Sequence, residues 1–320
     1  MPLDPFLAPL LANLPPLPDH IDDFDAFRAQ ETAGADALVD QLMEPGPDVA
    51  SEQTISIPVE GGVIDLVVFQ PFSGGPHPVH LYIHGGGWIS GTAHSRATAN
   101  TCRERAIGAD CTVIAIEYRK APEHRFPTAL NDCFAALTWV ANHGDQLGIR
   151  PELITVGGGS AGANLAAALT LKSRDEGGPA IAFQLLEVPA LDLTLASPSL
   201  QENGTGYDLT LDAIRELAAL YLPSSDDATN PYASPLLAPG LSGLPPAYIM
   251  SSEFDPLRDD GARYAEALTA AGVPAQFSLQ LGHIHASSAF TKVMQSARDW
   301  RDEALTVLLR ANRRPATTVG

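Results

Sequence analysis

The sequence predicts an α/β fold: a mostly parallel sheet of about eight strands, flanked by helices and overlain by a helical cap. Three observations favour it. Short, β-branched apolar segments recur along most of the chain, and stretches with helical periodicity separate them. The strand segments are apolar almost throughout, as in parallel sheets buried on both faces. The 320 residues, 45% of them hydrophobic, can supply one large core of this kind.

Strand and helix candidates alternate from residue 54 onward. The strand candidates lie at 54–58, 63–70, 79–83, 112–118, 153–157, 182–188, 247–251 and 277–281. The helix candidates lie near 96–109, 128–142, 161–174, 261–271 and 287–309. This alternation predicts strand–helix–strand units that return the chain to one sheet.

Two segments fall outside this alternation. The N-terminal segment is proline-rich and then helical, with Ile21, Phe24 and Phe27 on one helical face. Between 191 and 244 no strand is predicted, only a helix near 211–220. We expect both segments to fold over the sheet edge as a cap. The expected boundaries are 1–50 and 195–235 for the cap, 51–194 and 236–320 for the core, and 312–320 for a frayed tail.

The formal net charge of −19, with few and scattered Lys and Arg, limits the partners. Such a surface repels phosphate backbones and anionic lipid, so neither nucleic acid nor a membrane surface is an expected partner. Strongly anionic substrates are disfavoured for the same reason. No apolar run reaches the roughly 18 residues of a membrane span.

The cysteines and the N-terminus bear on location. Cys102, Cys111 and Cys133 cannot all pair, and none has the spacing of a metal or redox site. Three reduced thiols fit a reducing compartment. The first basic residue is Arg28, after several acidic ones, which does not match a secretory signal. The sequence therefore predicts a cytoplasmic protein.

The strongest local signal is an apolar strand, a tight glycine turn and a small-residue helix between 153 and 166. Gly158-x-Ser160-x-Gly162 lies at the bend and matches the nucleophile elbow of α/β-hydrolases. The serine of an elbow occupies a strained turn, and side chains in place of the two glycines would collide with the neighbouring strand and helix. The helix N-terminus supplies N–H groups where negative charge develops.

A dinucleotide-binding loop is the rival interpretation. Gly157, Gly159 and Gly162 also fit G-x-G-x-x-G after a strand, with Asp175 and Glu176 roughly where a ribose-binding acid would fall. Those acids lie in a helix-ending turn, however, whereas the fingerprint needs an acid at the end of the next strand. The motif alone leaves elbow, dinucleotide loop and plain packing turn open.

A second glycine segment follows the predicted strand at 79–83, in the sequence His84-Gly-Gly-Gly-Trp. Three glycines leave backbone N–H groups uncovered, as an oxyanion hole requires. Esterases combine such a loop with the N–H of the residue after the nucleophile. The expected donors are therefore Gly85, Gly86 and Ala161, and His84 is expected to orient the loop.

The acid and the base of an α/β-hydrolase lie on loops after later strands, in the order Ser, acid, His. Asp255 and His285 each follow a predicted strand in that order. Asp259 and Asp260 are nearby but fall at a helix N-terminus, where carboxylates favour the dipole. His283 competes with His285 as the base. As a metal pair the two histidines lack a further ligand at suitable spacing.

Several motifs occur in the same order as in a known family. They are the oxyanion loop at 84–88, a bend at 118–127, the elbow at 158–162, the acid motif at 253–261 and the histidine motif at 282–285. Through them the chain resembles, nearly end to end, the hormone-sensitive-lipase-like family (family IV) of bacterial carboxylesterases. The resemblance implies that His285 is the base and that short or medium acyl chains are preferred.

Three positions depart from that family. Gly159 replaces the usual Asp or Thr before the serine, and Ala286-Ser287 replace Gly-Phe after the histidine, which removes an aromatic wall. Glu187 stands where an apolar residue is usual; it is either a hydrogen-bonded structural acid or a pocket group that repels anionic substrates. The candidate pocket residues are Trp88, Gly159, Glu187, Tyr207, Leu211 and Ala286.

The prediction is a serine carboxylesterase that hydrolyses small, uncharged esters. Ser160 attacks the carbonyl, His285 transfers the proton, Asp255 orients the histidine, and water hydrolyses the acyl-enzyme. This chemistry needs no metal or organic cofactor. The expected partners are the ester substrate and water. The sequence does not decide between a monomer and a homodimer. A lactone fits the same chemistry, and a ligand receptor of this fold is the competing class, which the presence of His285 disfavours.

Overall fold

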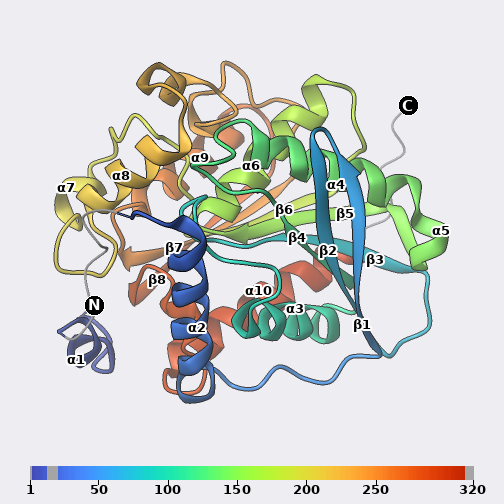
Figure 1. Ribbon diagram of the computed structural model, residues 1–320, viewed down its shortest axis with the longest axis horizontal. Coiled ribbons are helices and arrows are strands. Elements are labelled where there is room, and N and C mark those ends of the chain that lie inside the picture. Colours follow the sequence, from blue (N-terminus) through green and yellow to red (C-terminus); the bar gives the residue numbers. More distant parts are fainter. Residues whose placement is uncertain (1, 13–20, 314–320) are drawn as a thin grey trace.

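A single sheet of eight strands runs through the computed structural model, which describes residues 2–12 and 21–313 (Figure 1). The strand order is β1-β2-β4-β3-β5-β6-β7-β8. Strand β2 is antiparallel to β1 and β4, and all other neighbours are parallel. The predicted fold and all eight predicted strands are confirmed. The strands are β1 (Ser51–Val59), β2 (Gly62–Gln70), β3 (His77–Ile83), β4 (Thr112–Glu117), β5 (Ile149–Gly159), β6 (Phe183–Glu187), β7 (Ala247–Phe254) and β8 (Ala275–Ile284).

Helices cover both faces of the sheet (Figure 1). On one face lie α3 (Arg96–Gly108) and α10 (Gln295–Asn312), and on the other lie α4 (Thr128–Asn142), α6 (Ala161–Asp175) and α9 (Arg258–Ala270). Strands β3 and β4 are buried along almost their whole length, which explains their continuous apolar sequence. The remaining helices are α1 (Leu7–Leu11), α2 (Phe24–Leu42), α5 (Gly144–Leu147), α7 (Ser199–Glu202) and α8 (Leu211–Tyr221), with 3₁₀ turns at Ser225–Thr229, Pro235–Leu237 and Ser287–Ala289.

Helices α2 and α8 begin at side-chain caps. Asp23 accepts a hydrogen bond from the N–H of Ala26 at 3.0 Å, and Thr210 accepts one from the N–H of Ala213 at 3.1 Å. Such caps satisfy N–H groups that the first turn of a helix leaves unpaired.

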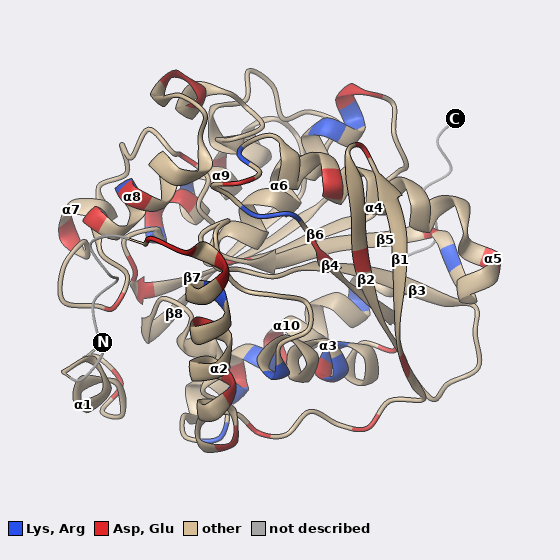
Figure 2. Cartoon of the chain, viewed as in Figure 1, with Lys and Arg blue, Asp and Glu red and all other residues tan. Residues whose placement is uncertain are grey.

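Acidic residues outnumber basic ones by 38 to 19, and Figure 2 shows acidic residues on α2, α7 and α8.

The C-terminal helix differs from its predicted bounds. It begins at Gln295 rather than near 287, because the preceding backbone is fixed to the C-terminal end of α2: Lys292 donates its N–H to Leu42 O at 2.9 Å. It also includes Asn312, which was predicted to lie in a frayed tail. The Asn312 side chain is buried and donates to Ala109 O at 3.0 Å. The rest of that predicted tail, 314–320, and part of the N-terminal segment, 13–20, lie outside the described residues.

Across residues 2–12 and 21–313, no helix combines the length and apolar character needed to span a bilayer.

Candidate active site

Ser160 lies in a sharp turn between β5 and α6. Its φ of +56° and ψ of −120° are unfavourable for a residue with a side chain. The turn is held by two close backbone approaches. A Cβ added to Gly158 would lie 2.1 Å from Ile83 O, and one added to Gly162 would lie 2.0 Å from the same oxygen. Only glycine fits at these two positions, so β3, β5 and α6 pack closely beneath the exposed hydroxyl.

Three side chains from three loops meet at this turn. His285 Nε2 lies 2.9 Å from Ser160 Oγ, and His285 Nδ1 lies 2.7 Å from Asp255 Oδ2. Asp255 is fully buried after β7, and its Oδ1 accepts the N–H of Leu257 at 2.8 Å. The structure thus brings together the three residues that the sequence analysis selected, in a continuous hydrogen-bonded chain.

The rival acids and base are engaged elsewhere. His283 Nδ1 lies 2.8 Å from Ser287 Oγ, and its ring packs edge-on against Trp300. Asp259 Oδ2 accepts the N–H of Ser199 at 2.9 Å. Asp260 is buried and accepts two backbone N–H groups of the chain that follows β6. These contacts hold the chain that follows β6 to α9.

The pKa of His285 is raised above its ordinary value. Burial alone lowers it, but the charge of Asp255, the hydrogen bond to Asp255 and the charge of Asp208 more than offset burial. A carboxylate beside the imidazole stabilises its protonated form, which is the form that a base reaches after it accepts a proton. The electrostatics therefore suit proton transfer from Ser160.

The loop after β3 approaches the nucleophile. A Cβ added to Gly85 would lie 2.9 Å from Gly159 O and 3.6 Å from Ser160 Cβ. Gly86 has a φ of +119°, and a Cβ there would lie 2.2 Å from Ser90 O. Within the described part of the chain, the N–H groups of Gly85 and Gly86 have no hydrogen-bond acceptor. They are therefore free to bind a negatively charged oxygen beside Ser160.

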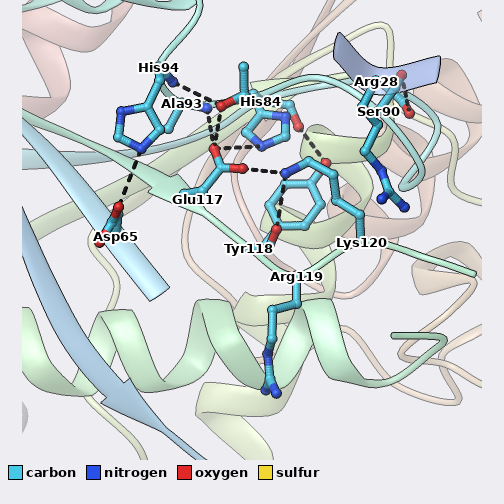
Figure 3. A network of polar contacts seen from close by, with 12 residues as sticks. Arg28, Asp65, His84, Ser90, Ala93, His94, Glu117, Tyr118, Arg119 and Lys120 are labelled. Carbon is cyan, nitrogen blue, oxygen red and sulfur yellow. Dashed lines mark hydrogen bonds and ion pairs between the residues drawn. The ribbon is translucent and has the colours of Figure 1, made fainter. Parts of the chain in front are cut away.

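Figure 3 shows how His84 supports this loop. Its Nδ1 lies 2.8 Å from Gly85 O, and its ring stacks on Tyr118 at 4.3 Å between centroids. Glu117, which is hydrogen-bonded to Lys120, lies 3.9 Å from His84 Nε2. Burial, followed by the charge of Lys120, lowers the pKa of His84 to about 4. The ring is neutral near pH 7 and contacts the loop rather than the nucleophile.

Comparison with known proteins agrees with this geometry. Residues 80–289 match a family described as having the alpha/beta hydrolase fold. The carboxylesterase NlhH of Mycobacterium tuberculosis is 38% identical over 317 residues, which cover 97% of this chain and 96% of that protein. The chain belongs to the hormone-sensitive-lipase-like family. It is a carboxylic ester hydrolase of the α/β-hydrolase fold.

Other relatives of this esterase extend over most of its length. The arylesterase of Saccharolobus solfataricus is 35% identical over 295 residues, covering 89% of this chain and 92% of that protein. The solved structure of a hyperthermophilic esterase from the archaeon Pyrobaculum calidifontis matches with a TM-score of 0.89 at 34% identity, covering 97% of this chain and 99% of the other. The whole architecture, including the segments outside the sheet, is thus similar to that of known esterases.

The candidate pocket residues have different surroundings in the structure. Trp88 is buried, and its ring stacks on Tyr221 of α8 at 4.5 Å between centroids. Tyr207 is half-buried and packs on Phe254 at 5.0 Å. Leu211 is half-buried at the start of α8, where its N–H donates to Gly204 O. Ala286 is exposed directly after His285, with a φ of +59°.

Glu187 is held by other residues beneath the elbow. Its Oε2 pairs with the guanidinium of Arg105, which is 4% exposed, and its Oε1 accepts Nε1–H of Trp300 at 3.0 Å. Its backbone oxygen accepts the N–H of Ser160 at 2.8 Å. Of the two interpretations left open by the sequence, this geometry favours the structural one. Removal of one partner of such a buried pair typically costs about 3–5 kcal/mol of folding free energy.

Two buried asparagines were not identified from the sequence. Asn164, on α6, donates from Nδ2 to Ala190 O at 2.7 Å and to Ala233 O at 2.9 Å. Asn203 donates from Nδ2 to Asp255 O at 3.2 Å. Both fix parts of the segment between β6 and β7 against the rest of the fold. The only available signal for Asn164 was a polar residue among the small, apolar residues of its helix. The sequence around Asn203 held no such signal.

Replacement of Gly159 by Asp, the residue usual in the family, is expected to leave measurable esterase activity. A Cβ added to Gly159 has no atom within 4 Å, so the side chain has room. Gly158→Ala is the matched control at the neighbouring position, where the Cβ would meet Ile83 O, and it should abolish activity or folding. Hydrolysis of a neutral aryl ester and the thermal midpoint are measured for both variants. Complete inactivity of a folded Gly159→Asp protein would show that this elbow differs from the family's.

Proposed function

We propose that this esterase hydrolyses small, uncharged esters of short to medium acyl chain through a Ser160–His285–Asp255 triad. The observation that carries the proposal is the pair of contacts at 2.9 Å and 2.7 Å that links the three side chains. The strained conformation of Ser160 supports it, because strain in a folded chain is concentrated at functional positions.

The proposed reaction proceeds in two halves. His285 takes the proton of Ser160 as its oxygen attacks the ester carbonyl, and Asp255 stabilises the resulting imidazolium. The oxyanion is bound by the N–H groups of Gly85, Gly86 and Ala161, the last at the N-terminus of α6, where N–H groups lack intrahelical partners. His285 then protonates the leaving alcohol. In the second half, water loses a proton to His285, attacks the acyl-enzyme and releases the acid.

A limit on substrate size is part of the proposal and rests on a cap made of residues 1–50 and 195–235. Two contacts support it. A Cβ added to Gly87 would lie 2.7 Å from Leu217 Cδ2 of α8, and Arg28 of α2 donates from Nε to Ile89 O at 2.7 Å. Both segments therefore lie against the end of the oxyanion loop and the residue after it, and a pocket that they close there would favour short acyl chains.

A cytoplasmic location is also part of the proposal. Cys102, Cys111 and Cys133 are free and buried, and free thiols are typical of reducing compartments. Cell fractionation of the native host should recover the activity with cytoplasmic markers.

A phosphonate serine probe tests the proposed nucleophile. It should label the esterase once, with the adduct on Ser160, and block hydrolysis. A series of aryl esters with roughly two to twelve acyl carbons, together with a lactone, then measures the size limit. An adduct elsewhere, or activity that survives complete labelling of Ser160, would contradict the triad. A rate that rises steadily toward the longest chains would contradict the size limit.

The pH dependence of kcat/KM should follow His285. Its pKa is raised above the ordinary 6.5, so the ring keeps its proton to higher pH. Only the neutral ring can accept a proton from Ser160, so kcat/KM should increase with pH along a limb whose midpoint lies above 6.5. The measurement is kcat/KM for a neutral ester from about pH 5 to about pH 9. Because this substrate does not titrate in that range, the change in kcat/KM reports on the enzyme alone. A midpoint below 6.5 would contradict this assignment.

A further inference from the structure

The loop between α7 and α8 lies beside the acid and base of the site. The Tyr207 ring packs on the Phe254 ring at 5.0 Å between centroids. Phe254 immediately precedes Asp255 and pairs across the β7–β8 register with Ile284, which immediately precedes His285. Tyr207 therefore rests on the residue that leads into the proposed acid, and that residue pairs with the one that leads into the proposed base. The Asn203 side chain fixes the start of the same loop to the backbone of Asp255.

Asp208 follows Tyr207 in the same loop, next to the contact of Tyr207 with Phe254. It is exposed, with a φ of +68°, in the left-handed region that Asp and Asn adopt more readily than other residues with a side chain. Burial of the carboxyl group by its surroundings raises its pKa, His285 lowers it, and Asp255 raises it again. In return, Asp208 contributes to the raised pKa of His285. The carboxyl group thus lies within electrostatic reach of the imidazole.

The Asp208 carboxylate has no partner of its own. Within residues 2–12 and 21–313 it forms no hydrogen bond and no ion pair with Lys or Arg. Other acids near the site differ: Glu187 pairs with Arg105, and Asp212 pairs with Arg215. An exposed, unpaired carboxylate beside His285 is available to a charged group of the substrate.

We propose that Asp208 is a specificity-determining residue that extends the range of small, uncharged esters to those with a cationic group, such as a quaternary ammonium, in the alcohol portion, and favours these over their neutral isosteres. The inference rests on the proposed function, in which His285 protonates the leaving alcohol. The alcohol oxygen must therefore approach His285, and substituents on that side of the ester pass the Asp208 loop. An anionic alcohol portion is repelled by the same carboxylate.

The size of the effect follows from the separation of two partly solvated charges. At a few ångströms, such a pair contributes roughly 1 kcal/mol in water and more near protein. We expect the ratio of kcat/KM for a cationic ester to that for its neutral isostere to fall about 5- to 10-fold when the charge of Asp208 is removed. Added salt should lower the same ratio in the unmodified enzyme, because salt screens exposed charges.

The test compares three acetate esters at pH 8, well above the range in which a carboxyl group ordinarily titrates. One carries a trimethylammonioethyl alcohol, one its neutral isostere 3,3-dimethylbutanol, and one an alcohol with a terminal carboxylate. They are assayed with the unmodified enzyme, with Asp208→Asn, and with Asp212→Asn as the control. Asn accepts a positive φ, so Asp208→Asn keeps the loop conformation. Asp212→Asn changes the net charge equally at an exposed position of α8.

The expected result is a lower cationic-to-neutral ratio and a higher anionic-to-neutral ratio in Asp208→Asn alone. If the neutral ester is hydrolysed but both ratios agree within twofold among the three proteins, Asp208 does not select substrates, and the triad proposal stands. Equal changes in Asp208→Asn and Asp212→Asn would also overturn the inference, because they would show an effect of net charge. Failure of the unmodified enzyme to hydrolyse any of the three, or to react with the phosphonate, would contradict the proposed function itself.

Discussion

Ser160→Ala is expected to lower kcat about 10⁶-fold, the loss measured when the serine of a triad is removed. The alanine retains the backbone turn but removes the oxygen that forms the acyl-enzyme. No other hydroxyl is hydrogen-bonded to His285 within the described residues. The measurement is kcat for a neutral aryl ester, with thermal unfolding as a check that the variant is folded.

Ser173→Ala is a suitable control for that variant. Ser173 lies on the same helix, α6, and its Oγ donates to Pro179 O at 2.7 Å, away from the triad. This control should keep kcat within about threefold, because the buried Ser173 hydroxyl contacts none of the three triad side chains. A loss of less than about tenfold in Ser160→Ala would show that another group attacks the ester.

Asp255→Asn is expected to lower kcat about 10⁴-fold. The carboxylate accepts hydrogen bonds from both His285 Nδ1 and the N–H of Leu257. An amide can present an N–H to the imidazole instead, which stabilises the tautomer that cannot take the Ser160 proton. The measurement is kcat across pH, and the acid limb should move to lower pH because the largest influence that raises the pKa of His285 is lost.

Asp259→Asn is the matched control for Asp255→Asn. Asp259 stands in the first turn of α9 and binds the backbone of Ser199 rather than His285. It should change stability more than kcat. If Asp255→Asn lost less than about tenfold, the neighbouring carboxylate of Asp208 would become the candidate partner of the histidine.

The sequence predicted the parts of the fold that depend on local pattern. Strands β3, β4 and β5 were visible as apolar runs because each is buried on both faces. The elbow could be predicted because backbone atoms approach Gly158 and Gly162 so closely that no side chain fits at either position. The order of Asp255 and His285 after their strands placed them at the same sheet edge, and the structure brings both to Ser160.

What could not be predicted depends on contacts between distant segments. The environment of Glu187 was undecided because its partner, Arg105, lies 82 positions earlier in the chain. The start of α10 was misplaced because the preceding backbone is bound to Leu42. Asp208 carries no motif, and its place near His285 follows from the packing of Tyr207 on Phe254.

The contacts of α8 with the loop after β3 have a consequence for redesign of this esterase. Leu217 lies against the backbone at Gly87, and Tyr221 stacks on Trp88, so α8 rests on the two residues that directly follow Gly85 and Gly86, the proposed oxyanion donors. A change in α8 that alters the substrate range is therefore expected to alter the turnover rate as well. A cap transplanted from a relative should work only if it brings side chains of matching shape at 217 and 221, and libraries that vary α8 should yield trade-offs rather than independent gains.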